Sequence, residues 1–253
     1  LYPGAVEKWD FSDFDFVITS SNSYAHGIVT TTNTKHISYY HSPMRYAWDW
    51  TNEYRDENDL KGLKGALWTM FLKKLRLWDR LAAERPDIVI ANSKNVAERI
   101  KKYYRRDSKV IYPPVDLKRF KVNKKSEDYF LIVSTLTPYK KVDLAVKLFN
   151  KLRRRLVVIG DGPQKDYLKS IAGKYVEILG FKDDDVVKEY LENCRALIFP
   201  GEEDFGIASV EAMACGKPVL AFGKGGVKES VVAGKTGEFF DEQSLDFMED
   251  ALT

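Results

Sequence analysis

The sequence has little cysteine, histidine and net charge, and each scarcity excludes a class of protein. Only two cysteines, Cys194 and Cys215, occur among 253 residues, and both lie in apolar stretches. We therefore expect buried thiols in a reducing compartment. The three histidines do not cluster with cysteines or acids at zinc-like spacing, so we predict no metal site. The net charge of +3 is too small to indicate a nucleic-acid partner.

Long apolar runs are also lacking. No stretch of about 18 apolar residues occurs, so nothing in the sequence is expected to span a membrane. The first residues, LYPGAVEKWDF, resemble neither a signal peptide nor a transit peptide, and we expect a cytoplasmic protein. The chain lacks an initiator methionine and stops at DFMEDALT, within a predicted helix. We therefore expect a fragment, truncated at both ends, of a longer protein.

Short apolar runs alternate with segments of helical periodicity. The runs are residues 14–20, 36–40, 87–93, 129–134, 156–160, 176–180, 196–200 and 218–222. Several are apolar on successive residues, as strands covered on both faces must be. Between them, segments such as VDLAVKLFNKL (142–152) place their apolar residues on one helical stripe. This alternation predicts the α/β class, with parallel sheets and right-handed crossovers.

One segment differs in character from the rest. Residues 112–128, YPPVDLKRFKVNKKSED, contain two prolines and many basic residues but no sustained apolar period. This composition favours a connector between two α/β domains over a surface loop. We expect an incomplete N-terminal Rossmann-like domain over 1–114, a linker over 115–127 and a second Rossmann-like domain over 128–253.

Five loops of the second domain are predicted at one edge of its sheet. Ligands of open parallel sheets bind beyond the carboxyl ends of the strands. The loops there are TLTPYKK (135–141), GDGP (160–163), GFKDDD (180–185), GEEDFG (201–206) and GKGG (223–226). Four of the five contain glycine, which permits tight turns and a close backbone approach. Together they indicate a nucleotide-binding crevice.

The stretch GEEDFGIASVEAMACGKPV (201–219) carries two glutamates, Glu203 and Glu211, around a predicted helix start near Gly206 or Ile207. The free amides and dipole of that helix would suit a phosphate. Glu211, one turn inside, would suit the paired hydroxyls of a ribose, because a carboxylate accepts two hydrogen bonds side by side. Glu203 would be free to meet a sugar hydroxyl or a developing positive charge. The alternative is that both are acids favoured at a helix start by the dipole.

Lys140 and Lys141 follow Thr137-Pro138, a pattern typical of an N-cap and a first helical turn. Lysines there face the unfavourable end of the dipole, at a cost of a few tenths of a kcal/mol, and a bound diphosphate would reverse that sign. The alternative is a pair of solvated lysines.

The segment from Glu203 to Glu211, with EAMACGKPV after it, resembles the Glu-x7-Glu signature of retaining nucleotide-sugar glycosyltransferases. It is most similar to glycosyltransferase family 4 (group 1), which has the two-domain GT-B fold. Similar segments follow in the family's usual order: YPPVDLKRF (112–120), TPYKKVDLAV (137–146), VVIGDGP (157–163), EILGF (177–181) and GGVKESVVAGKTGEFF (225–240). In the first half, YYHSPMRYAWDW (39–50) and IANSKNVAERI (90–100) resemble the mannosyltransferase-like branch.

This resemblance implies an acceptor-side first domain and a nucleotide-sugar-binding second domain. It implies that His41 and Glu203 lie at the transferred sugar, that Lys140 neutralises the leaving diphosphate, and that no metal or other cofactor takes part. Donor-binding residues would be Glu211 at the ribose, Phe205, Gly206 and Ile207 at the sugar and diphosphate, Phe181 and Lys182 at the base, and Thr135, Lys141, Gly225 and Gly226.

Two departures from the family pattern bear on activity. The family usually has an arginine five residues before the lysine, where this chain has Thr135. A single lysine is a weaker anion site than an arginine and a lysine together, so we expect slow turnover unless Lys141 substitutes. The family's N-terminal glycine-rich loop would precede Leu1, so this chain alone is expected to bind donor poorly.

Residues 62–85, GLKGALWTMFLKKLRLWDRLAAER, are basic and rich in large apolar residues. Their basic residues include Lys64, Lys73, Lys74, Arg76 and Arg80, and their aromatic residues are Trp68, Phe71 and Trp78. Such a helix could bind an anionic membrane surface and bring the protein to a lipid-linked acceptor at the inner face of the membrane. The alternative is a helix whose wide apolar stripe packs on the sheet.

We therefore predict an enzyme of polysaccharide biosynthesis, a retaining, metal-independent hexosyltransferase. The donor expected is GDP-mannose or a similar nucleotide sugar, and the acceptor is a glycan or a lipid-linked saccharide. One alternative is a non-catalytic nucleotide-sugar-binding subunit, which Thr135 in place of arginine allows but the presence of Glu203, Glu211, Lys140 and His41 argues against. Another is a hydrolase or epimerase on the same fold.

Overall fold

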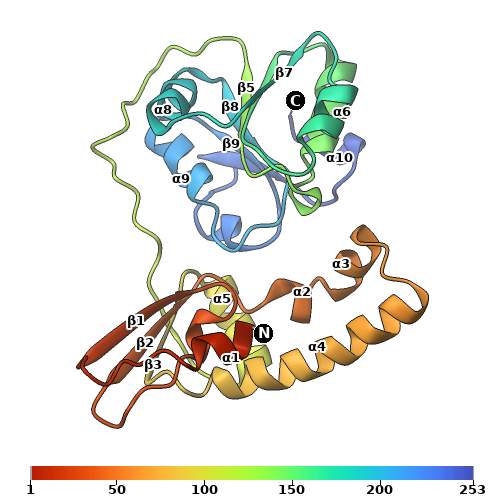
Figure 1. The fold of residues 1–253 in the computed structure, drawn as a ribbon. Coiled ribbons are helices and arrows are strands. Elements are labelled where there is room, and N and C mark those ends of the chain that lie inside the picture. The colour runs from red at the N-terminus through yellow and green to blue at the C-terminus, as the bar shows by residue number, and fades with distance from the viewer. Residues whose placement is uncertain (1, 253) are drawn as a thin grey trace. The chain divides into compact units, whose positions relative to one another are not determined.

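The computed structural model describes residues 2–252, and it divides them into two compact units between Tyr112 and Pro113 (Figure 1). Each unit combines a parallel sheet with helices. The α/β class predicted from the sequence is therefore confirmed. Among the residues described, no helix is both long and apolar enough to cross a membrane.

Unit 1, which precedes Pro113, contains a parallel sheet with the strand order β1-β2-β3-β4. The strands are β1 (Phe16–Ser21), β2 (Lys35–Tyr40), β3 (Ile88–Ala91) and β4 (Lys109–Val110). The helices are α1 (Tyr2–Val6), α2 (Arg45–Trp48), α3 (Thr51–Glu57), α4 (Gly62–Ala82) and α5 (Lys94–Tyr104), with a 3-10 turn η1 (Ala25–Gly27).

The two faces of this sheet differ. Alternate residues of β2 and β3 are buried, and Tyr40 and Val89 pack against Ile100 and Tyr104 of α5. On the opposite face the large apolar side chains of β1 and β3 are exposed, among them Phe16, Ile18 and Ile88.

A fully buried carboxylate connects the helices of unit 1. Asp79 of α4 accepts hydrogen bonds from the indole of Trp48 at 2.7 Å and the hydroxyl of Tyr104 at 2.8 Å. The Nε2 of His26 lies 3.2 Å from its other oxygen, a distance typical of an ion pair but without hydrogen-bond alignment. Asp79 therefore satisfies the side-chain donors that α2 and α5 bring to it, and η1 places an imidazole beside its other oxygen.

Replacing Asp79 with alanine is expected to lower the free energy of unfolding of unit 1 by about 3 kcal/mol, because it leaves two buried donors without an acceptor. All five tryptophans precede Pro113, so their fluorescence in a urea titration reports on unit 1 alone. Asp107→Ala is the matched control, since that carboxylate is 93% exposed. Equal midpoints for the two variants would contradict the role assigned to Asp79.

Unit 2 contains a six-stranded parallel sheet with the order β10-β9-β8-β5-β6-β7. The strands are β5 (Phe130–Val133), β6 (Leu156–Ile159), β7 (Val176–Gly180), β8 (Ala196–Phe199), β9 (Val219–Phe222) and β10 (Gly237–Phe240). The helices are α6 (Val142–Leu152), α7 (Lys165–Ile171), α8 (Asp184–Asn193), α9 (Ile207–Ala214) and α10 (Leu245–Asp250), with the 3-10 turns η2 (Pro138–Lys140) and η3 (Gly226–Glu229).

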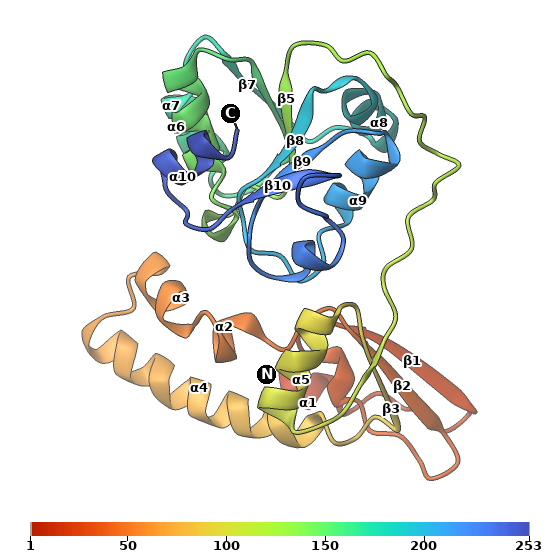
Figure 2. The ribbon, with the colours of Figure 1, turned by 180° about the vertical axis from the view of Figure 1, so that it is seen from behind.

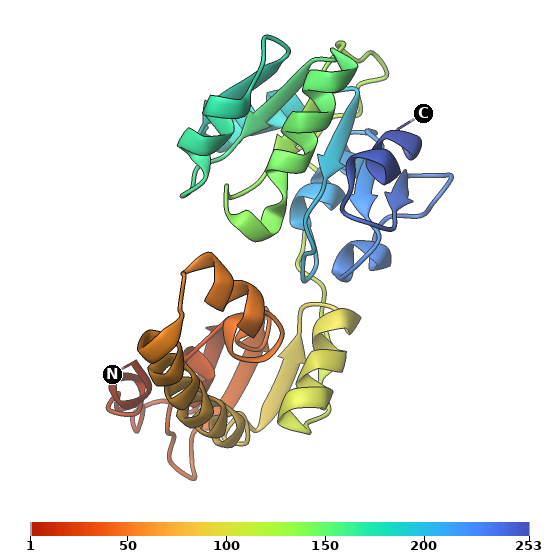
Figure 3. The same cartoon turned by 90° about the vertical axis from the view of Figure 1, so that its right-hand side faces the viewer.

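Helices cover both faces of this sheet. Figures 2 and 3 show α6, α7 and α10 on one face, and Figure 2 shows α8 and α9 on the other. The strand side chains alternate between two apolar clusters, so that Ile132 packs toward α6 while Leu131 packs toward α8 and α9. Both cysteines belong to the second cluster, and burial raises the pKa of Cys194 to about 12. The continuous apolar runs in the sequence reflect this double coverage.

The strand order fixes where a ligand can bind in unit 2. From β5 the chain proceeds outward through β6 and β7, and then crosses to the other side of β5 to form β8 and β9. The carboxyl ends of β5 and β8 are therefore the topological switch point, where open α/β sheets form their crevice.

Candidate functional site

Two charged side chains meet at the switch point of unit 2. Lys140 lies in η2, just after β5, and Glu203 lies in the loop after β8. The Nζ of Lys140 donates a hydrogen bond to Oε1 of Glu203. Lys140 is only 9% exposed, so its ammonium needs a counter-charge. The two loops come this close because residue 201 is glycine: a Cβ there would lie 2.8 Å from the Cα of Lys140.

The local backbone explains how Lys140 is presented. Lys141 has a φ of 53°, a left-handed conformation that ends η2 and caps the start of α6. The sequence suggested a single helix starting at Thr137, but the structure has a 3-10 turn followed by a separate helix. The side chain of Thr137 makes no capping hydrogen bond in the 3-10 turn. Lys141 itself is exposed.

The loop that carries Glu203 is fixed by the loop after β9. The amide of Gly226 donates to the carbonyl of Glu203 at 2.8 Å, and Glu203 forms an isolated bridge with Gly225. A Cβ at Gly226 would lie 2.0 Å from the carbonyl oxygen of Asp204, so only glycine allows this approach. Gly225 and Gly226, predicted as donor-binding residues, thus hold the Glu203 loop in place.

Helix α9 begins as the sequence predicts. Gly206 precedes it with a φ of 88°, and its carbonyl accepts a hydrogen bond from the Ser209 hydroxyl at 2.6 Å. Phe205 is buried, while Ile207 is 46% exposed at the first position of the helix. Glu211 lies one turn inside.

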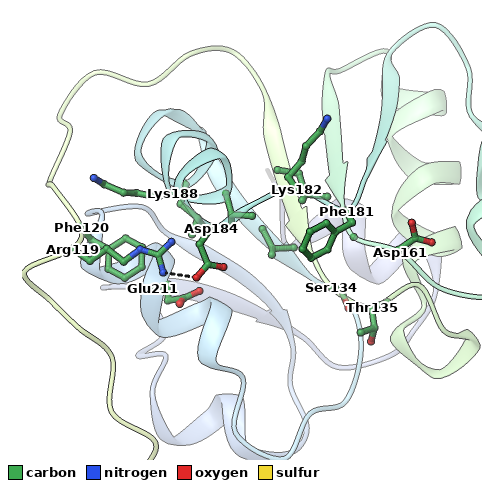
Figure 4. Close-up of a pocket in the computed structure, with 15 residues that line it drawn as sticks. Arg119, Phe120, Ser134, Thr135, Asp161, Phe181, Lys182, Asp184, Lys188 and Glu211 are labelled. Carbon is green, nitrogen blue, oxygen red and sulfur yellow. Dashed lines mark hydrogen bonds and ion pairs between the residues drawn. The ribbon is translucent and has the colours of Figure 1, made fainter.

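A pocket of about 520 Å³ lies beside this helix, within unit 2 (Figure 4). It is formed by the loops after β5, β6 and β7, the helices α8 and α9, and the segment before β5. The residues that line it are Arg119, Phe120, Val133, Ser134, Thr135, Ile159, Gly160, Asp161, Phe181, Lys182, Asp184, Val187, Lys188, Leu191 and Glu211. Four predicted site residues, Thr135, Phe181, Lys182 and Glu211, are therefore brought together.

Figure 4 shows the Glu211 carboxylate beside two charged side chains of this pocket, Arg119 and Asp184, which pair with each other. Burial raises the pKa of Glu211 above its ordinary value of 4.5, the Arg119 guanidinium lowers it, and the Asp184 carboxylate raises it. Arg119 Nη1 lies 3.3 Å from Asp184 Oδ2, and Asp184 is 89% exposed. The pocket therefore contains the half-buried carboxylate of Glu211 next to Arg119. The ion-pair partner of Arg119, Asp184, is exposed to solvent.

Several lining residues were not predicted from the sequence. Arg119 and Phe120 end the segment YPPVDLKRF, and Asp184 and Lys188 lie on α8. Arg119 and Phe120 belong to the predicted linker, where we assigned no site residue. The adjacent basic and aromatic residues, Arg119 and Phe120, were the feature of the sequence that could have indicated a binding role for this segment.

His41 lies in unit 1, exposed at the carboxyl end of β2. Its Nε2 is 2.8 Å from the hydroxyl of Ser20 on β1, and its ring lies edge-on to Tyr39 at 5.3 Å between centroids.

Over residues 2–252 no group of three or more His, Cys, Asp or Glu side chains could hold a metal ion. The roles assigned to all these residues stay predictions.

Comparisons with known families cover nearly the whole chain. Residues 115–253 match the model described as Glycosyl transferases group 1, and residues 2–119 match that of Glycosyltransferase Family 4.

Two curated relatives illustrate this likeness. The chain is 30% identical over 169 residues to an uncharacterized glycosyltransferase of Methanocaldococcus jannaschii, covering 65% of the chain and 48% of that protein. It is also 30% identical over 138 residues to a GDP-mannose-dependent alpha-(1-6)-phosphatidylinositol monomannoside mannosyltransferase of Mycobacterium tuberculosis, covering 47% of the chain and 36% of the relative. The chain thus spans half or less of these two relatives.

A solved structure supports the fold. Sucrose-phosphate synthase from Thermosynechococcus elongatus resembles the chain with a TM-score of 0.70 at 19% identity, covering 89% of this chain and 63% of that one. The likeness agrees with the two Rossmann-like units of the GT-B fold expected from the sequence.

Proposed function

Because the chain belongs to the glycosyl transferases group 1 family, we propose that it transfers a hexose from a nucleotide-diphosphate sugar to a glycan or lipid-linked acceptor. The proposed reaction retains the anomeric configuration and needs no metal ion. The observation that carries this proposal is the Lys140–Glu203 ion pair at the switch point of unit 2, in the same unit as the pocket that holds Glu211.

In the proposed transfer, the bond between the anomeric carbon and the diphosphate oxygen breaks, and a bond to an acceptor hydroxyl oxygen forms. Negative charge grows on the diphosphate as it leaves, and the hydroxyl proton is released. Lys140 is positioned by Glu203 and stabilises the leaving charge, a role that needs a cation held in place before the reaction. Glu211 accepts the ribose hydroxyls, and Phe181 and Lys182 flank the base.

The donor we propose is GDP-mannose. Two observations favour it: the first half of the sequence resembles the mannosyltransferase-like branch, and the Mycobacterium tuberculosis relative is named GDP-mannose-dependent. His41 is proposed to act at the transferred sugar, in keeping with its exposed position at a strand end.

Calorimetric titration of this chain with GDP and then UDP, each repeated with EDTA, tests the proposal. We expect GDP to bind more tightly than UDP and its affinity to be unchanged by EDTA. Binding that disappears with EDTA would overturn metal independence, and a preference for UDP would overturn the donor.

As the pH is lowered, affinity for GDP is expected to fall when Glu211 becomes protonated. This fall should begin at a higher pH than it would for a glutamate with the ordinary pKa of 4.5. Burial raises the pKa of Glu211 above 4.5, and the protonated carboxyl accepts ribose hydrogen bonds less well. Comparing wild type with Glu211→Gln over pH separates this effect from titration of the phosphate. Parallel pH profiles in the two proteins would contradict it.

Introducing Thr135→Arg is expected to tighten GDP binding about tenfold, because an arginine adds charge-assisted hydrogen bonds to the diphosphate. Thr135 is exposed at the pocket, so the longer side chain needs no rearrangement of the core. Ser170→Arg is the matched control, since Ser170 is exposed on α7 and does not line the pocket. If Thr135→Arg raises affinity but no transfer follows in the complete enzyme, a non-catalytic binding subunit becomes the better description.

A further inference from the structure

Helix α4 of unit 1 has two apolar faces, and only one of them is used in packing. Leu72 and Leu75 are buried in a cluster with Met44 and Ala47, next to α2. Figure 1 shows α2 and α3 along one side of α4. The sequence left open whether the whole apolar stripe packs inside the unit, and the structure shows that it does not.

We call the other face the outer stripe. It consists of Leu63, Leu67, Met70, Leu77 and Leu81, which are between 55% and 78% exposed. Their spacing of four, three, seven and four residues keeps them on one face of a helix. Leu63 and Leu81 are 18 residue steps apart, or about 27 Å along the helix axis. Five large apolar side chains in a continuous row form a patch rather than scattered surface residues.

Within α4 itself the exposed charges have one sign. Lys64, Lys73 and Lys74 are exposed, and Lys74 lies within the stripe itself, four residues after Met70. Between residues 61 and 83 the sequence has a single acid, Asp79, and that carboxylate is buried. The exposed surface of α4 therefore combines apolar side chains with positive charge.

The structure also identifies which members of residues 62–85 do not belong to this surface. Arg76 donates a hydrogen bond to the hydroxyl of Thr51 at 2.9 Å, and Trp78 donates to the carboxylate of Glu7 at 2.9 Å. Trp68 stacks on Tyr54 with ring centroids 5.2 Å apart. These three side chains are used inside unit 1, so leucines and lysines form the outer surface.

We propose that the outer stripe of α4 binds an anionic lipid surface, with the helix lying in the interfacial plane. Leucine and methionine side chains enter the boundary between headgroups and acyl chains, and the lysine ammonium groups contact the lipid phosphates. A second copy of the chain fits less well, because pairing two outer stripes would bring Lys73 and Lys74 of both copies together without an acid. This proposal does not depend on the transferase reaction.

Co-sedimentation with vesicles tests the proposal. We expect the protein to bind vesicles of phosphatidylcholine mixed with phosphatidylglycerol, to bind pure phosphatidylcholine weakly, and to be released by high salt. Each lysine near an anionic surface contributes about fivefold in affinity, so Lys73→Glu with Lys74→Glu is expected to weaken binding by at least about tenfold. The pair Lys101→Glu and Lys102→Glu on α5 makes the same charge change elsewhere in unit 1 and should have a smaller effect.

The contribution of the apolar side chains to vesicle binding is tested with a separate variant and its control. Leu67→Ser with Met70→Ser should weaken vesicle binding about tenfold or more, because exposed apolar carbons no longer enter the lipid. Ile18→Ser is the control, since Ile18 is 72% exposed on the sheet instead of α4 and should leave binding unchanged. An environment-sensitive fluorophore on Met70→Cys should shift to the blue with anionic vesicles, while one on Lys102→Cys should not. The two natural cysteines are buried and should not label.

Three results would overturn the proposal. The first is no binding to anionic vesicles at low salt. The second is binding that the α4 variants leave unchanged while the control variants abolish it. The third is concentration-dependent dimerisation, seen by sedimentation velocity and lost with Leu67→Ser and Met70→Ser, which would assign the outer stripe to a second copy.

Discussion

Transfer by a Lys140→Met variant is expected to be slower than wild type by about 10²- to 10³-fold, the usual cost of removing one preorganised group from a developing negative charge. The ammonium of Lys140 is nearly buried and already aligned by Glu203. Its orientation is therefore fixed before the donor binds, and no reorganisation is needed during the reaction. Methionine keeps the length and apolar stem of lysine. The measurement is the turnover number of the complete enzyme at saturating donor.

Two further variants define what that loss means. Lys147→Met on α6 removes an exposed lysine that pairs with Asp143 by an i,i+4 contact and lies outside the pocket, and it should leave turnover unchanged. Glu203→Gln should also slow transfer, and the double variant should lose less than the product of the single effects, because each partner positions the other. A Lys140→Met enzyme with normal turnover would remove Lys140 from the mechanism.

Glu211→Ala is expected to weaken GDP binding about 100-fold, because two hydrogen bonds to a charged carboxylate each contribute about 1.5 kcal/mol or more. Glu211 is half-buried at the pocket, where water competes poorly for these bonds. The measurement is calorimetric titration with GDP and, separately, with guanine lacking ribose. Only the nucleotide should lose affinity in the variant.

Glu189→Ala provides the comparison, since Glu189 is an exposed glutamate on α8 that does not line the pocket. It changes the net charge of unit 2 by the same amount and should leave GDP affinity unchanged. Equal losses in Glu189→Ala and Glu211→Ala would mean that general electrostatics, rather than a ribose contact, explains the effect.

The elements of unit 2 were easier to predict than those of unit 1. Its strands β5, β6, β8 and β9 are continuous apolar runs because both faces of the sheet are covered, and such runs are visible in the sequence alone. Strand β4 was not predicted, because it consists of two residues, Lys109 and Val110, that carry no pattern. The two-step start of α6 was also missed. A left-handed residue such as Lys141 depends on the surrounding packing, and lysine gives no local signal for it.

The sequence by itself determined the class of the fold, the order of most of its elements and the identity of the family, because periodicity and short motifs are local properties. It also supplied the candidate residues Lys140, Glu203 and Glu211. Only the tertiary structure decided that Lys140 and Glu203 form an ion pair, that Arg119 joins Glu211 at one pocket, and that one apolar face of α4 remains exposed. The ion pair and the pocket join segments that are far apart in the chain, and the exposure of a helix face depends on which other elements pack on it. Both follow from strand order and helix packing, which no local pattern encodes.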